Sequence, residues 1–267
     1  MRYVPFGVSN IAWPGAELDE ALGLLSKMGC TAVEIAPFNV FQRWDGIDEP
    51  AKRLRDRIER HGLVCSALQG ILYNVPQVEL FTNDGTRVAL LRHLESVARL
   101  AGTLGAKACV FGAPKQRDPG ELPYDKAWAI AVETFRAAGP VFAAFGSALA
   151  FEANAGRYGC RFVRTTAEAA KLVAAVNSPG IGLQIDTGTL FLEGENPSVL
   201  TQAAPFAVHC HVSEPDLRAP GMENHDPIAA GLRRSQYAGS LSVEMRLTDD
   251  WRVAIPQAIR FVRSAYT

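Results

Sequence analysis

The sequence predicts a (β/α)8 barrel: eight parallel strands with helices around them. Short apolar runs alternate with longer segments of helical period, and eight such pairs follow one another along the chain. The chain has 267 residues, close to the length of about 250 that is typical of one barrel. No linker rich in Pro, Gly and Ser divides it. We therefore expect a single barrel domain over residues 1–267.

The predicted strands are short and rich in β-branched and aromatic residues, as is typical of parallel strands that are buried on both faces. In chain order they are Val4–Ser9, Ala32–Ala36, Leu63–Gln69, Ala106–Gly112, Ala148–Glu152, Ile181–Asp186, Phe206–His211 and Leu241–Glu244. The carboxyl ends of such strands meet at one mouth of the barrel, where the active sites of this fold lie. Residues that end a strand are therefore the first candidates for function.

The helices between the strands carry recognisable start and stop signals. Pro50 opens a predicted helix over Pro50–His61, and Gly62 follows it. Thr165 precedes the segment Thr166–Val176 as a good N-cap residue. The third helix, over Thr86–Leu104, has apolar residues at helical spacing with arginines around the rest of its circumference, so we expect it on the outside of the barrel.

Composition limits the classes of partner. The chain is 48% hydrophobic, and its 27 basic and 28 acidic residues are interspersed and give a net charge of −1. There is no basic stripe of the kind that binds a phosphate backbone, so we expect no nucleic-acid partner. No stretch of about 18 apolar residues occurs, so we expect no membrane span. The five cysteines are scattered without a C-x-x-C motif, which favours a reducing, cytoplasmic location.

Four ionisable side chains close predicted strands five to eight: Glu152, Asp186, His211 and Glu244. They are about 30 residues apart, the length of one βα unit. Carboxylates are rarely buried unless they are paired or bind a metal. Taken singly, each could instead cap a helix or pair with an arginine, and Asp186 before Thr187 would make a fair N-cap. Together they predict one shared divalent-metal site.

Three carboxylates and one imidazole form a hard, mostly oxygen donor set. Such a set favours Mn²⁺, our first choice, with Mg²⁺ or Co²⁺ as alternatives, over a structural zinc. His209 has the same strand parity as His211 and should also point into the barrel. There it could orient a metal ligand without binding the metal itself. The alternative is a core histidine with satisfied hydrogen bonds.

Two glutamates beside a metal suit proton transfer at carbon. A proton next to a carbonyl is too weakly acidic for a carboxylate alone, but a metal that polarises the oxygen stabilises the developing enediolate. Glu152 and Glu244 would then act as the catalytic pair, one removing the proton and the other returning it. This chemistry predicts an epimerase or isomerase of a small sugar or polyhydroxy ketone.

Four residues near earlier strands are candidates for substrate binding. They are Trp13 after strand one, Glu34 and Gln69 at the ends of strands two and three, and Lys115 after strand four. Trp13 could wall a pocket or pack locally, and Glu34 and Gln69 could bind hydroxyl groups or pair with an arginine or lysine inside the barrel. Lys115, with Arg117 in the same loop, could hold a phosphate or carboxylate of the substrate or be an ordinary surface charge.

These residues also carry a family resemblance. It rests on Glu152-Ala153-Asn154, Asp186-Thr187-Gly188, His209-Cys210-His211 with Glu214, and Tyr237-Ala238-Gly239-Ser240 leading to Val243-Glu244. The chain resembles the xylose isomerase-like sugar isomerase/epimerase superfamily of divalent-metal TIM barrels, which includes the ketose 3-epimerases and, more distantly, endonuclease IV. The resemblance spans essentially the whole chain.

The resemblance implies roles for particular residues. Glu152, Asp186, His211 and Glu244 would bind the metal, and the two glutamates would also be the acid–base pair. Glu214 and Arg218 would contact a carbohydrate substrate. A homodimer or homotetramer and a role in carbohydrate metabolism would also follow.

The chain departs from the ketose 3-epimerases at two positions. Gly188 stands where they have a histidine that contacts the substrate, and Arg218 lies four positions after Glu214, not three. The substrate is therefore open. One alternative is a lyase of the same superfamily, of the inosose dehydratase or C-glycoside deglycosidase type. A second is a metal-dependent phosphodiesterase like endonuclease IV, against which the low count of five histidines argues.

Overall fold

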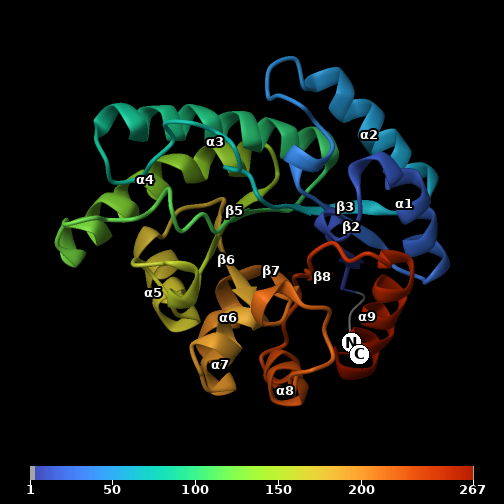
Figure 1. The fold of residues 1–267 in the computed structure, drawn as a ribbon. Coiled ribbons are helices and arrows are strands. Elements are labelled where there is room, and N and C mark those ends of the chain that lie inside the picture. Colours follow the sequence, from blue (N-terminus) through green and yellow to red (C-terminus); the bar gives the residue numbers. More distant parts are fainter. Residues whose placement is uncertain (1–3, 267) are drawn as a thin grey trace.

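The computed structural model describes residues 4–266 and shows eight parallel strands in a nearly closed barrel with helices around it (Figure 1). The strands are β1 Phe6–Val8, β2 Ala32–Ile35, β3 Val64–Leu68, β4 Ala108–Phe111, β5 Ala148–Glu152, β6 Ile181–Asp186, β7 Ala207–Val212 and β8 Ser240–Val243. Each strand from β2 to β7 pairs with the strand that follows it in the chain, and β8 pairs with β1. An isolated bridge between Ser9 and Glu34 joins the remaining seam, between β1 and β2. The predicted fold class is confirmed.

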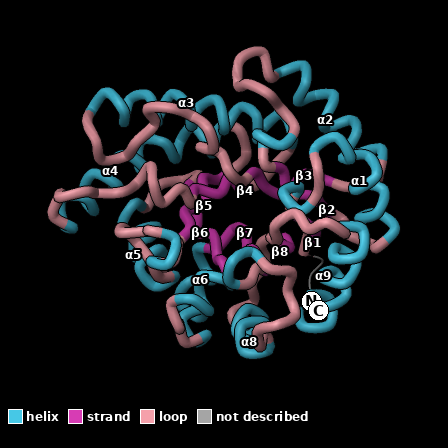
Figure 2. Tube along the Cα trace, viewed as in Figure 1, coloured by secondary structure: helices cyan, strands magenta, loops and turns pink. Residues whose placement is uncertain are grey.

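The helices form a ring outside the strands, which gather at the centre of the molecule (Figure 2). They are α1 Leu18–Lys27, α2 Asp48–Arg60, α3 Asp84–Leu104, α4 Tyr124–Ala144, α5 Thr166–Val176, α6 Thr187–Leu192, α7 Leu200–Ala203, α8 Asp226–Arg234 and α9 Trp251–Tyr266. Within residues 4–266, no helix combines the length and the apolar character that crossing a bilayer requires.

Some of the capping signals in the sequence locate helix ends well, but α2 begins at Asp48, two residues before the predicted Pro50. Thr165 accepts a hydrogen bond from the backbone N–H of Glu168, whose side chain caps in return, so α5 has the predicted bounds. Gly62 follows α2 with a φ of +72°, a conformation that glycine adopts without strain. Helix α3 begins two residues before the predicted Thr86, because the side chain of Asn83 accepts from the backbone N–H of Thr86.

The barrel interior combines small apolar and buried polar side chains. Ala67, Ala108 and Ala150 form an inner cluster against which Val208 packs. The pairing register shifts between Val33 and Glu34 in β2 and between Leu183 and Gln184 in β6. Such irregularities re-aim side chains, and they are common beside active sites. The polar interior of this barrel is therefore positioned by departures from regular pairing.

Candidate metal centre

The structure brings together the four side chains expected to share a metal. Glu152 and Asp186 end β5 and β6, His211 lies in β7, and Glu244 follows β8 directly. Nδ1 of His211 is 3.4 Å from Oε1 of Glu152 and 3.1 Å from Oε2 of Glu244. Glu152, Asp186 and His211 each offer a donor atom within 4.8 Å of the others. The arrangement is a compact cluster at the carboxyl ends of consecutive strands.

The charges in this cluster suit a cation. Burial, reinforced by the carboxylates of Glu152 and Glu244, raises the pKa of Asp186 to about 7. Although burial opposes it, the charges of Glu244 and Glu34 raise the pKa of His211 well above its ordinary value. Nδ1 of His211 is buried beside the carboxylates of Glu152 and Glu244 but makes no hydrogen bond of good geometry with the described residues. Three crowded carboxylates around this ring nitrogen fit a divalent cation, which would offset their mutual repulsion.

Asp186 has a structural role as well as its place in the cluster. Its Oδ1 accepts a hydrogen bond of 2.6 Å from the backbone N–H of Thr189, so it is the N-cap of α6. Its Oδ2 accepts one of 2.6 Å from the hydroxyl of Ser213. The capping interpretation and the metal interpretation of Asp186 are thus compatible.

Gly188 makes room for this arrangement. Its backbone N–H donates to Oγ of Ser213 at 2.9 Å. A Cβ atom at position 188 would lie 2.9 Å from the same Oγ and 3.4 Å from Oδ1 of Asp186. The absence of a side chain at Gly188 therefore leaves room for Ser213, whose hydroxyl donates to the proposed metal ligand Asp186.

Glu152 is held by residues on two loops. Nδ2 of Asn154 donates to Oε2 of Glu152 at 2.8 Å. Nη2 of Arg117 donates to Oδ1 of Asn154 at 2.9 Å, and its Nη1 donates to the backbone carbonyl of Glu152 at 2.6 Å. Arg117 is fully buried, with its guanidinium over the ring of Phe151. The position of Arg117 after strand four allowed it to hold an anionic group of the substrate, but its guanidinium is buried against Glu152 and Asn154.

A second buried cluster lies against the first and shares His211 with it. Oε1 of Glu34 is 2.9 Å from Nε2 of His211 and 3.3 Å from Nε2 of His209. These three residues are also close enough together to hold a metal ion. Burial alone would raise the pKa of Glu34, but the two imidazoles outweigh it, and the net effect lowers this pKa.

The position of Glu34 corrects one expectation. We expected Glu34 to bind substrate, but its side chain is 0% exposed and is paired with the two histidines. Its partners inside the barrel are histidines and not the arginine or lysine of the alternative interpretation. His209 lies where a residue that orients a ligand would be, and its Nδ1 is 2.6 Å from Oγ of Ser240.

None of the other early candidates is among the residues that line the cavity beside the carboxylate cluster. Trp13 is buried and packs against Trp251, with ring centroids 6.5 Å apart, so it is a core residue and not a pocket wall. The side chain of Gln69 is turned to Ser9, whose Oγ accepts its amide hydrogen bond at 2.6 Å. Lys115 is exposed on the loop after β4.

Glu214 and Arg218 lie on the loop after β7. Oε1 of Glu214 accepts hydrogen bonds of 2.6–2.9 Å from the backbone N–H groups of Gly221, Met222 and Glu223. Glu214 lines the cavity beside the cluster, but this oxygen is engaged in holding the loop. Arg218 is partly exposed, 3.7 Å from Glu223, and donates to the carbonyl of Pro215.

The cavity beside the cluster has a volume of about 500 Å³. Its lining consists of the proposed ligands Glu152, Asp186 and Glu244 together with Pro114, Asn154, Tyr158, Gly188, Thr189, Ser213, Glu214, Asp216 and Leu217. Five of these are acidic, and among the described residues no lysine or arginine lines it. The cavity is therefore strongly acidic unless a cation is bound.

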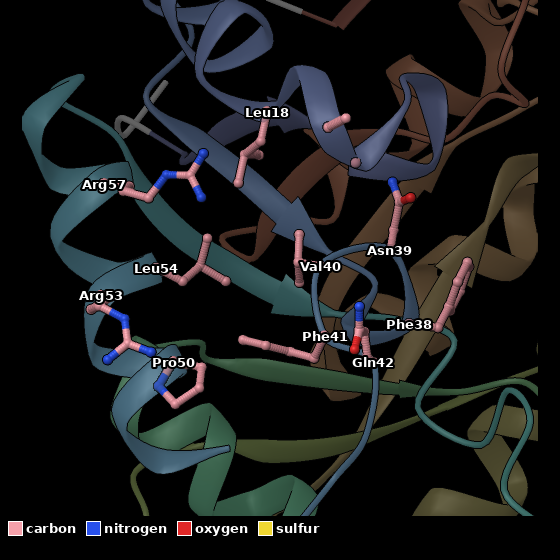
Figure 3. Close-up of a pocket in the computed structure, with 12 residues that line it drawn as sticks. Leu18, Phe38, Asn39, Val40, Phe41, Gln42, Pro50, Arg53, Leu54 and Arg57 are labelled. Carbon is pink, nitrogen blue, oxygen red and sulfur yellow. The ribbon is translucent and has the colours of Figure 1, made fainter. Parts of the chain in front are cut away.

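A second cavity, of about 570 Å³, lies between α1, α2 and the loop after β2 (Figure 3). Phe41 and Pro50 form part of its apolar wall, and Arg53 and Arg57 lie on its α2 side. Arg57 is paired with Asp19 at 3.0 Å. None of the clustered carboxylates lines this cavity, so the acidic cavity is the better candidate for chemistry.

Comparison with known proteins agrees with this architecture. The model of the xylose isomerase-like TIM barrel family matches residues 22–265. The chain belongs to this family. The family resemblance drawn from the motifs is thereby confirmed. No curated protein sequence matches the chain.

Solved structures of this fold superpose over nearly the whole chain. D-psicose 3-epimerase from Clostridium cellulolyticum H10, solved with D-tagatose, has a TM-score of 0.83 and 16% identity over 98% of this chain and 99% of its own. An L-ribulose 3-epimerase has a TM-score of 0.81 and 19% identity, covering 99% and 95%. An AP endonuclease family 2 protein from Brucella melitensis has a TM-score of 0.76 and 17% identity, covering 97% and 98%. At these identities the likeness shows the shared fold.

Proposed function

We propose that the protein is a divalent-metal-dependent isomerase or epimerase of a small sugar or polyhydroxy ketone. The observation that carries the proposal is that Glu152 and Glu244, from β5 and from the end of β8, both approach Nδ1 of His211 at one side of a 500 Å³ cavity. Structural neighbours that are sugar epimerases support the same class of reaction.

Glu152, Asp186, His211 and Glu244 would hold the cation. When bound, it would supply Lewis-acid stabilisation of the negative charge that develops on a substrate oxygen. The hard, oxygen-rich donor set favours Mn²⁺, with Mg²⁺ or Co²⁺ as alternatives.

The two glutamates would move the proton. One carboxylate removes the proton from the carbon next to the carbonyl, and the other delivers a proton to the opposite face of the resulting enediolate. Asn154 fixes Oε2 of Glu152, which leaves Oε1 on the side of His211 and the cluster. Return of the proton to the same carbon inverts its configuration, whereas return to the neighbouring carbon exchanges aldose and ketose.

The acidic cavity favours an uncharged substrate. A bound divalent cation would offset part of the charge of the cluster, and Arg157 pairs with Asp216 at 3.1 Å. No lysine or arginine among the described lining residues is placed to bind a phosphate group. Lys115, which we expected to hold a phosphate or carboxylate, is an exposed residue of the neighbouring loop. We therefore expect free sugars to be better substrates than their phosphates.

A single combined experiment tests the proposal. The purified protein is analysed for bound metal and then incubated in D₂O with free ketoses, ketose phosphates, inososes and keto-glycosides, and deuterium incorporation is followed by NMR. We expect deuterium at the carbon next to the carbonyl of a free ketose, and loss of this exchange when the metal is chelated. Metal-independent binding without exchange of any compound would contradict the proposal.

The same experiment tests the alternatives. Loss of water or of an aglycone from an inosose or keto-glycoside would identify a lyase in place of an epimerase. Cleavage of a phosphodiester would identify a nuclease, although an acidic cavity repels a nucleic-acid backbone. Light scattering tests the homodimer or homotetramer that the family resemblance implies.

A further inference from the structure

A chain of buried polar groups runs behind the carboxylate cluster. Oγ of Ser240 is 2.6 Å from Nδ1 of His209, whose Nε2 is 3.3 Å from Oε1 of Glu34. The same Glu34 oxygen is 2.9 Å from Nε2 of His211. The side chains of Glu34, His209 and His211 are at most 1% exposed. The chain joins β8, β7 and β2 and ends on the imidazole that faces Glu152 and Glu244.

The two ring nitrogens of His211 face different partners. Nε2 faces Glu34, and Nδ1 faces the carboxylates of Glu152 and Glu244. An ionised carboxylate can only accept hydrogen bonds, so the contact with Glu34 requires a proton on Nε2. A neutral imidazole protonated on Nε2 has its lone pair on Nδ1. The geometry thus selects the tautomer whose free lone pair points into the cluster.

The pairing of the strands is irregular beside both Glu34 and His209. The β2–β3 register shifts between Val33 and Glu34, and the β6–β7 register shifts beside Gln184, which pairs with His209. At the second shift, the consecutive residues Val208 and His209 both contact interior groups. Regular strand pairing is therefore interrupted at the two positions where Glu34 and His209 approach each other.

We propose that Glu34 is a positioning residue of the metal centre: it keeps the proton of His211 on Nε2 and so makes Nδ1 the metal-binding nitrogen. His209, fixed by its contact with Ser240, lies against the same Glu34 oxygen at 3.3 Å. This inference rests on the metal site of the proposed function, but it concerns metal affinity and not proton transfer. Carboxylates that accept from the outer nitrogen of a metal-binding histidine orient its ring and raise its basicity.

Metal affinity without substrate tests the proposal. Isothermal titration calorimetry of the metal-free protein with Mn²⁺, and Co²⁺ absorption spectra, are compared for the wild type, Glu34→Gln and Glu34→Ala. We expect affinity to fall about 10- to 100-fold, most in Glu34→Ala, with a changed Co²⁺ spectrum. Ser66→Ala is the matched control, because Ser66 is buried on the neighbouring strand and bonded to the carbonyl of Val33. It should bind metal like the wild type.

The tautomer of His211 provides a second measurement, which would not change if Glu34 had only a structural role. In metal-free protein labelled with ¹⁵N-histidine, at a pH at which His211 is neutral, the His211 signal should show protonated Nε2 in the wild type and a mixture of tautomers in Glu34→Ala. Ser240→Ala, which leaves Glu34 in place, should reduce metal affinity measurably but less than the Glu34 variants do, by less than about tenfold. This variant keeps the test decisive if the Glu34 variants fail to fold, as judged by circular dichroism: unchanged affinity in Ser240→Ala would then overturn the proposal.

Two other results would also overturn the proposal. One is wild-type metal affinity in folded Glu34→Gln and Glu34→Ala. The other is metal binding that survives Asp186→Asn but is abolished by Glu34→Ala and His209→Ala, which would make Glu34 a ligand. Failure of the proposed function gives a different pattern: weakened metal binding in the Glu34 variants, with no deuterium exchange in the wild type.

Discussion

The guanidinium of Arg117 donates a hydrogen bond of 2.6 Å to the backbone carbonyl oxygen of Glu152. The same group reaches Asn154, whose amide holds the side chain of Glu152. One buried cation from the loop after β4 thus fixes both the main chain and, through Asn154, the carboxylate of a proposed acid–base residue. Its burial shields these hydrogen bonds from water, which makes each of them stronger than at the surface.

Replacing Arg117 should lower both stability and turnover. Arg117→Met leaves the carbonyl of Glu152 and Oδ1 of Asn154 without their donor, and an unsatisfied buried acceptor costs about 1–3 kcal/mol. Denaturant titration and steady-state kinetics measure the two effects. Arg161→Met is the control, because Arg161 is exposed and paired with Asp118, where little change is expected. Unaltered stability in Arg117→Met would show that this network is not needed.

Each proposed proton-transfer glutamate should be essential for turnover. Glu152→Gln and Glu244→Gln keep the side-chain shape but remove the base, so kcat at saturating metal should fall about 10²- to 10⁴-fold. Metal affinity is measured separately, because both side chains are also proposed ligands. Glu121→Gln, an exposed glutamate of the loop before α4, is the control. Near-normal turnover in either site variant would refute the assignment.

The stability gained from metal should rise with pH. The pKa of Asp186 is raised from 3.8 to about 7 in the fold, so its contribution to metal-free stability is full below pH 3.8 and is lost as pH rises through 7. The raised pKa of His211 acts in the same direction, since its contribution is lost as pH rises through the folded value. Metal binding needs both groups deprotonated, so protons compete less with the metal as the pH rises over the same range.

Thermal unfolding between pH 5 and 8, with Mn²⁺ and with a chelator, measures this effect. The Tm difference between the two conditions should grow toward pH 8. In Asp186→Asn the metal-free protein should lose most of its pH dependence below pH 7. A Tm difference that is constant across the range would contradict the electrostatic account of the cluster.

A side chain at position 188 should weaken the metal centre. In Gly188→Ala the new Cβ would press on Oγ of Ser213, which donates to Asp186, and overpacking of this kind costs about 1–3 kcal/mol. We expect a lower Tm and weaker metal binding by calorimetry. Gly23→Ala in α1 is the matched control, because its Cβ would meet only the ring of His61 at 3.8 Å. Equal changes in Tm and in metal affinity in the two variants would contradict the steric explanation.

Local patterns account for the parts of the fold that the sequence predicted well. Strands β5 and β6 have the predicted bounds, and the Thr165 capping signal located α5, because both depend on side chains close in sequence. The strand-end positions of Glu152, Asp186 and Glu244 followed from the same periodicity. The start of α3 was two residues off, because Asn83 is its N-cap and the helix begins at Asp84 and not at Thr86.

The sequence by itself determined the barrel, the family and the residues that its strand ends present, because alternation of strands and helices and residues placed at strand ends are local properties. Only the tertiary structure decided which groups touch across the barrel. It placed Glu34 behind His211 at 2.9 Å, although 177 residues separate them in the chain, and it buried Arg117 behind Glu152. The bridge between β1 and β2 and the register shift beside Glu34 accompany the first contact, the loop after β4 supplies the second, and no local pattern of residues encodes either.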